Sequence, residues 1–390
     1  MKIVSKKMLY KIMIGFFFLL LVIPNVGLLR EQKNINHVAE MENRTINPLP
    51  RAKAMTAKFF SELEGWYNDR LLGRRDMIRS WAQWNGRVFN ILISKNVVRG
   101  KDGYLFSPTN MSTNLVDAKE KFATIKKIQE QCAKRNIRFV FVLTPNSEMV
   151  LSDLFNEKFP RINLPMVEKN IAIEMDKLNI EHCFVGADFV AMPLVERKNM
   201  YYEGDGHWTK IGGYYASKKL LKQLGYDKKI NLPVKKIEFQ TTEGGYFRDA
   251  GLPMVPSTHY YLWSEDFADK HYLFDNRDED HSSAVLTDNL GEYGTRGEDI
   301  LVNDKASSKV KLLMLGDSFS FAMKPYLLQD INTIVYSHSR DIHSPKKKID
   351  IEYMLDKYKP DVVVLQKMEA LFHWENYHET FGNIAVYKRK

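Results

Sequence analysis

The stretch Lys311-Leu-Leu-Met-Leu-Gly316-Asp317-Ser318-Phe319-Ser320 decides which fold the sequence predicts. Its apolar run has the length of a buried parallel β-strand, and the residues after it are compatible with a helix. Such a strand would deliver the Ser318 hydroxyl to its carboxyl end. The glycine permits a sharp turn there, and the first amides of the helix can face a negative oxygen. Ser318 can therefore be a nucleophile, or it can simply cap the helix.

Strand-like and helix-like segments alternate on both sides of a long irregular stretch. Strands are expected at 138–143, 181–185, 311–316, 333–337, 361–366 and 383–387, and helices at 119–135, 164–178, 209–224, 319–328 and 349–358. A short hairpin is expected at 97–106, where Asp-Gly marks the turn. The alternation predicts an α/β fold with a parallel sheet, and residues 229–309 form a loop-rich, partly β insertion.

The N-terminus carries a membrane-like segment. Four lysines precede an apolar run at 12–29, which predicts a single-pass anchor with a cytoplasmic N-terminus and an extracytoplasmic remainder. A cleaved signal peptide is the alternative, because the run is short for a span, and the protein would then be secreted. The expected organisation is an anchor or signal peptide at 1–30, a tether and helical segment at 31–95, two parts of one α/β domain at 96–228 and 310–390, and the insertion at 229–309.

Composition excludes some classes of function. The chain has 390 residues, 44% of them hydrophobic, and a net charge of +9 that four lysines before the apolar run partly explain. Because the remaining charge is spread thinly and no nucleic-acid motif accompanies it, we expect no nucleic-acid partner. The cysteines Cys132 and Cys183 can form a pair or remain as buried thiols. The spacing of cysteines and histidines predicts no metal site, and no cofactor is expected.

The segment Asp205-Gly206-His207 supplies what a nucleophilic serine needs. Residues two apart in an extended segment project to the same side, so Asp205 can bind one ring nitrogen of His207 and leave the other available. Together with Ser318 these side chains can fill the roles of orienting acid, base and nucleophile in acyl transfer. Taken alone, Asp-Gly-His before a helix is more often a loop with a surface histidine.

Further polar residues follow the expected parallel strands. Asn146 and the loop that contains Arg340 come after strand ends, as Ser318 does. Open α/β sheets bind ligands at this edge, so these residues are predicted to lie near one another. The alternative is that polar residues merely cap strands.

Four segments together carry a family resemblance: the Gly-Asp-Ser of 316–318, the Asp-Gly-His-Trp-Thr of 205–209, and residues 100–106 and 359–364. From about Phe59 to Lys390 the chain resembles the AlgX/AlgJ group of SGNH-hydrolase-like polysaccharide O-acetyltransferases. The resemblance implies a three-layer α/β/α fold, circularly permuted so that the aspartate and histidine precede the serine. It implies Ser318 as nucleophile, His207 as base and Asp205 as its orienting partner.

The resemblance also implies partners, and the placement of residues around the predicted site suggests further contacts. The acceptor would be a polysaccharide, and a multi-spanning membrane acyltransferase would supply the acetyl group. Phe319, Arg340, Asn146 and Trp208 are candidate contacts to substrate or oxyanion. The chain departs from the family at 145–147, where a lysine is common, and in the insertion, which carries no family motif. Two other functions stay open: an acetylesterase with the same triad, and a non-catalytic glycan-binding or assembly protein.

Overall fold

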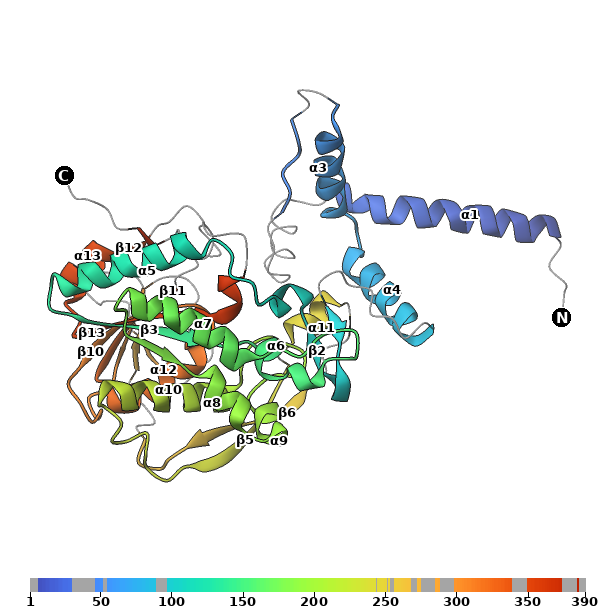
Figure 1. Cartoon of the computed structure of the whole chain (residues 1–390). Helices are drawn as coiled ribbons and strands as arrows, with labels where there is room; N and C mark the ends of the chain where they lie inside the picture. The colour runs from blue at the N-terminus through green and yellow to red at the C-terminus, as the bar shows by residue number, and fades with distance from the viewer. Residues whose placement is uncertain are drawn as a thin grey trace. The chain divides into compact units, whose positions relative to one another are not determined.

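The computed structural model describes residues 6–29, 46–51, 55–88, 97–242, 244–250, 252, 256–267, 272–274, 285–287, 298–338, 349–373 and 384–385 (Figure 1). The chain divides into two compact units. One comprises Met1–Lys95 with Arg248–Pro253, and the other comprises Asn96–Phe247 with Met254–Lys390.

The first unit is helical. It contains α1 (Lys6–Asn25), η1 (Val26–Leu29), α3 (Ala57–Asn68) and α4 (Arg74–Val88). The end of α1 is tied to the residues around α3, because Leu72 N–H donates to Pro24 O (2.8 Å) and Tyr67 donates to Asn25 Oδ1 (2.7 Å). The helical segment Lys7–Leu29, which contains an 18-residue window with a mean hydropathy of 2.5, is long and apolar enough to cross a membrane.

The second unit is built on a six-stranded sheet in the order β4-β3-β13-β10-β11-β9. Its strands are β3 (Arg138–Thr144), β4 (His182–Phe184), β9 (Glu298–Val302), β10 (Lys311–Gly316), β11 (Thr333–His338) and β13 (Val362–Met368). Neighbouring strands are parallel except at the β9 edge, where the pairing with β11 is antiparallel. The predicted α/β fold with a mostly parallel sheet is confirmed.

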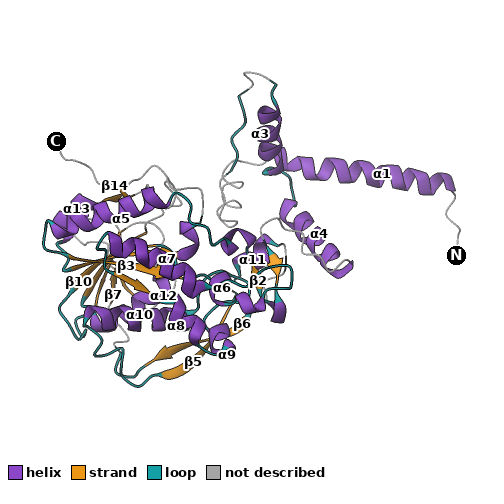
Figure 2. Cartoon of the chain, in the orientation of Figure 1, coloured by secondary structure: helices purple, strands orange, loops and turns teal. Residues whose placement is uncertain are grey.

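Helices cover both faces of the sheet. Figure 1 shows α5, α7 and α13 on one side and α10 and α12 on the other, and Figure 2 shows the strands between these helices. The covering helices are α5 (Ala118–Ala133), α7 (Leu164–Lys177), α10 (Lys210–Leu224), α12 (Ser320–Asp330) and α13 (Ile351–Tyr358). Because both faces are covered, the middle of each central strand is apolar on both sides, and in β10 the residues Leu312 to Leu315 are completely buried.

A hairpin and several smaller elements accompany the central sheet and its covering helices. The predicted hairpin is confirmed as β1 (Val98–Arg99) and β2 (Leu105–Phe106), with positive φ at Asp102 and Gly103. The other elements are α6 (Ser147–Val150), α8 (Gly186–Ala191), α9 (Leu194–Asn199), α11 (Gly245–Asp249), β5 (Lys235–Thr241), β6 (Ser257–Trp263), β7 (Tyr272–Phe274), β8 (Val285–Thr287), β12 (Ile349–Asp350), β14 (Ile384–Ala385), η2 (Lys101–Gly103), η3 (Pro108–Met111), η4 (Ser152–Leu154) and η5 (Glu369–Phe372).

Three details differ from, or add to, the expectations from sequence. β9 falls within the predicted insertion, yet it forms the antiparallel edge of the central sheet because it pairs with β11. The C-terminal strand β14 pairs with β12 in a separate two-stranded sheet. Cys132 and Cys183 are free thiols and both are buried, so of the two alternatives left open the structure has the unpaired one.

Candidate active site

The turn after β10 presents Ser318. A Cβ atom on Gly316 would lie 1.9 Å from Ser320 Oγ, so this position requires glycine. The buried Asp317 secures the turn on the neighbouring strand: its N–H donates to Gln366 Oε1 (2.9 Å), and its Oδ2 accepts from Met368 N–H (2.6 Å). The aspartate of the Gly-Asp-Ser motif therefore holds the serine in place.

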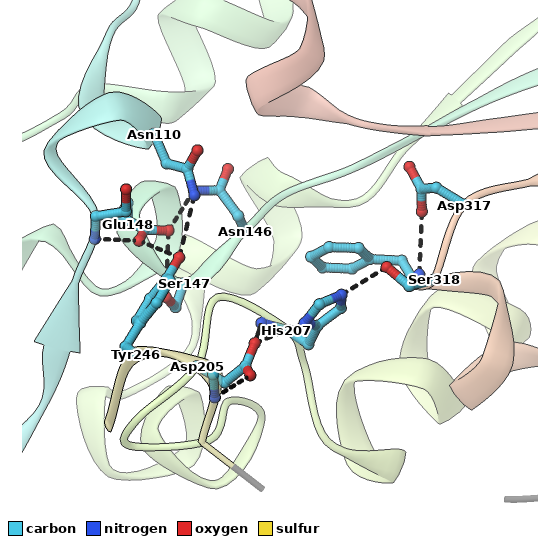
Figure 3. A network of polar contacts seen from close by, with 12 residues as sticks. Asn110, Asn146, Ser147, Glu148, Asp205, His207, Tyr246, Asp317 and Ser318 are labelled. Atoms are coloured by element: carbon cyan, nitrogen blue, oxygen red, sulfur yellow. Dashed lines mark hydrogen bonds and ion pairs between the residues drawn. The ribbon is translucent and has the colours of Figure 1, made fainter. Parts of the chain in front are cut away.

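The loop before α10 brings Asp205 and His207 to the same edge of the sheet. Asp205 Oδ1 accepts the His207 backbone N–H (3.0 Å) and lies 2.6 Å from ring Nδ1. Ring Nε2 lies 2.5 Å from Ser318 Oγ (Figure 3). If Nδ1–H donates to the carboxylate, Nε2 is the acceptor for the serine hydroxyl. The structure thus joins the three predicted residues in one chain of hydrogen bonds.

Electrostatics favour an ionised Asp205. Burial by itself would raise the pKa of this carboxyl, but the neighbouring His207 and the backbone amides of His207 and Gly245 lower it to about 2. The Asp205 side chain is 14% exposed and the His207 side chain 43%. The carboxylate is therefore shielded and charged at neutral pH, while the imidazole can be reached by a substrate.

Trp208 and Phe319, both predicted contacts, lie buried behind the site. The Phe319 ring packs against the His207 ring (centroids 5.0 Å apart) and against the Trp208 ring (5.1 Å). Trp208 Nε1–H donates to Phe319 O (2.9 Å), which links the histidine loop to the serine turn. These side chains align the two loops, and the geometry does not favour a direct contact between Trp208 and substrate.

The backbone amide of Phe319 is a predicted oxyanion donor. In the structure this N–H donates to Asp317 Oδ1 (3.0 Å), a partner that the sequence could not reveal. Its role toward an oxyanion stays a prediction. Arg340, another predicted contact, lies outside the described residues.

Asn146 is completely buried, and its amide nitrogen donates to the equally buried Glu148. Sequence reasoning missed Glu148 and its partner Tyr246, whose hydroxyl donates to Glu148 Oε1 (2.7 Å). No local pattern marks either residue, because their contact joins positions 98 residues apart. Among the described residues, no group of three or more His, Cys, Asp or Glu side chains could hold a metal ion.

Comparisons with known proteins agree with this architecture. In solved structures, the fold is similar to a DHHW family protein from Eubacterium siraeum (TM-score 0.55, 14% identity, covering 75% of this chain and 96% of that one). It is also similar to Bacillus cereus PatB1, solved with a sulfonyl adduct (TM-score 0.54, 16% identity, 71% and 97%). No curated protein matches the sequence.

A family model gives the assignment. The model describes the SGNH hydrolase-like domain of the acetyltransferase AlgX, and it matches residues 97–364. This range covers more than half of the chain and includes Asp205, His207 and Ser318. The chain therefore belongs to the AlgX family of SGNH hydrolase-like acetyltransferases.

Proposed function

We propose that the protein is a membrane-anchored, extracytoplasmic O-acetyltransferase that modifies a cell-surface or exported polysaccharide through an acyl-enzyme. One observation carries the proposal: in a member of an acetyltransferase family, Asp205, His207 and Ser318 form a continuous chain of hydrogen bonds. Each side chain has the geometry that its role in acyl transfer needs.

In the first half-reaction, Ser318 Oγ attacks the carbonyl carbon of a donor acetyl group while its proton passes to His207 Nε2. The bond between the acetyl carbon and the donor breaks, and the leaving group takes the proton from Nε2. Asp205 remains ionised and stabilises the imidazolium. The product is an acetyl ester on Ser318.

In the second half-reaction, His207 Nε2 removes the proton from a sugar hydroxyl, whose oxygen attacks the acetyl carbonyl. The ester bond to Ser318 breaks, and the proton returns to Oγ. The backbone amide of Ser318 is the candidate donor to the oxyanion of each step, and one such donor is worth about 3 kcal/mol. No cofactor takes part in these steps.

The N-terminal segment supports the location. Lys7–Leu29 can span a membrane by length and composition, and the lysines before it favour a cytoplasmic N-terminus. An extracytoplasmic enzyme needs its acetyl group delivered across the membrane. A multi-spanning membrane acyltransferase would be the donor partner.

An acetylesterase is the alternative with the same triad, in which water replaces the sugar hydroxyl. The purified full-length protein, incubated with an acetyl ester and an unacetylated polysaccharide, separates the two. We expect acetyl groups on the glycan. Free acetate as the sole product, even at saturating glycan, would contradict the transferase.

A non-catalytic role in glycan binding or assembly is tested in cells. We expect Ser318→Ala to abolish acetylation of the polysaccharide, because it removes the Oγ atom that is hydrogen-bonded to His207 Nε2. Ser61→Ala, at an exposed position of α3, is the matched control and should leave acetylation intact. Normal acetylation in the Ser318→Ala strain would favour the non-catalytic role.

A further inference from the structure

The predicted insertion reaches the active site through the segment Gly244–Phe247. Gly245 N–H donates to Asp205 Oδ2 (2.8 Å), and Tyr246 N–H donates to Gly204 O (2.8 Å). Figure 3 shows Tyr246 beside Asp205. Because His207 binds the other oxygen of the carboxylate, the insertion supplies a hydrogen bond that the catalytic triad itself does not.

Two glycines allow the insertion to approach so closely. A Cβ atom on Gly206 would lie 2.4 Å from the Tyr246 hydroxyl oxygen, and one on Gly204 would lie 2.0 Å from the Phe247 ring. Neither distance is compatible with a side chain. The insertion therefore packs directly on the backbone at both positions that flank Asp205.

Two hydrogen bonds hold the Tyr246 hydroxyl next to Gly206. It donates to Glu148 Oε1 (2.7 Å) and accepts from Asn110 Nδ2 (3.0 Å). Glu148 lies on α6, is completely buried, and accepts a hydrogen bond from Ser107 N–H in the segment after β2. The hydroxyl is thus clamped between two buried polar groups and cannot move away from Gly206 without breaking both bonds.

Glu148 is itself held in a single position. Ser107 N–H donates to Oε1 (2.7 Å), and Oε2 accepts from Asn146 Nδ2 and from Ser147 Oγ (3.3 Å). With Tyr246 this makes four donors around one carboxyl group, and these hydrogen bonds oppose the rise in the pKa of Glu148 that burial causes. Ser147 N–H also donates to Gly206 O (3.0 Å), so the same turn contacts the catalytic loop.

We propose that Tyr246 is a positioning residue for the Asp205–His207 pair. Its hydroxyl, bound to Glu148, keeps the insertion against Gly204 and Gly206, and the Gly245 amide then holds Asp205 in line with His207. The insertion is in this way part of the catalytic apparatus. The inference rests on the proposed function, because it concerns catalysis by the triad.

The test compares Tyr246→Phe, Gly206→Ala and the double variant in the full-length protein. Hydrolysis of 4-nitrophenyl acetate gives kcat and KM, and labelling by phenylmethanesulfonyl fluoride gives the reactivity of Ser318. We expect Tyr246→Phe to lower kcat about tenfold with KM nearly unchanged, because it misplaces a catalytic pair and removes no substrate contact.

The double variant provides the decisive comparison. Gly206→Ala alone should have a lower kcat than Tyr246→Phe, because its methyl group would clash with the Tyr246 hydroxyl. Removing that oxygen leaves a ring carbon at 3.3 Å as the nearest atom, so the double variant should be more active than Gly206→Ala alone. Tyr353→Phe, an exposed tyrosine on α13, is the matched control and should match the wild type.

The outcomes separate this inference from the proposed function. Wild-type kcat in Tyr246→Phe, or a double variant no more active than Gly206→Ala, would overturn the positioning role. So would a loss of activity that only follows a loss of folded protein in thermal unfolding. A wild-type protein that neither hydrolyses the ester nor reacts at Ser318 would contradict the proposed function, and the inference with it.

Discussion

At the scale of single residues, the site depends on how the two oxygens of Asp205 are used. Oδ1 binds the His207 backbone and ring, and Oδ2 binds the Gly245 amide. The Asp205 carboxylate faces three N–H groups and therefore acts only as a hydrogen-bond acceptor. In the proposed mechanism, its charge is therefore available to stabilise an imidazolium on His207.

Asp205→Asn tests this use of charge. The amide oxygen can keep the two bonds to His207, but the amide N–H then faces the Gly245 N–H and the negative charge is lost. We expect kcat for ester hydrolysis to fall by about 10⁴-fold with KM little changed. Asp304→Asn, an exposed aspartate before β10, is the control. A loss of less than tenfold in Asp205→Asn would contradict the role of the charge.

Residues differ in how far their roles could be predicted from sequence. Asp205, His207 and Ser318 lie in short motifs whose spacing indicates chemistry. Glu148 and Tyr246 lie in no motif. Their contact depends on burial of the Glu148 carboxyl group, which requires hydrogen-bond donors from distant segments. Local sequence does not encode such a set of donors.

At the scale of elements, the buried strands were the most predictable. β10 and β13 are covered on both faces and contain the continuous apolar runs Leu312–Leu315 and Val362–Leu365. β9 is an edge strand with two acidic residues at its start, so nothing in its sequence separates it from the insertion around it. Its place is decided by pairing with β11, a tertiary contact.

Another element-level feature is the carboxylate that caps α8. Glu168 on α7 accepts from Gly186 N–H (2.7 Å) and Ala187 N–H (2.8 Å), the first amides of α8. Burial raises the pKa of Glu168 from 4.5 to about 7, although the two amides oppose the rise. The folded protein therefore binds this proton more tightly than the unfolded chain does.

The raised pKa of Glu168 should make the free energy of unfolding depend on pH. Between pH 4.5 and about 7 the unfolded chain loses this proton first, so the free energy of unfolding should fall with rising pH, by up to about 3 kcal/mol. Glu168→Gln should remove this slope, and urea unfolding across the range measures it. Glu174→Gln, an exposed position on the same helix, should keep the slope. Identical slopes in wild type and Glu168→Gln would contradict the assignment.

At the scale of the whole molecule, the proposal joins a catalytic unit to a membrane helix. If Lys7–Leu29 is an anchor, the chain in cells should keep its N-terminus and stay in the membrane fraction after washing with alkaline carbonate. N-terminal sequencing and fractionation measure both. A soluble chain that begins after the apolar segment would instead indicate a cleaved signal peptide.

The central claim is that Ser318 carries the acetyl group between donor and acceptor. The most direct measurement is mass spectrometry of the full-length protein, quenched shortly after mixing with an acetyl donor in the absence of glycan. We expect one added acetyl group on the peptide that contains Ser318, its disappearance when glycan is added, and none in Ser318→Ala. Acetylated glycan formed by a protein that never carries acetyl on Ser318 would contradict it.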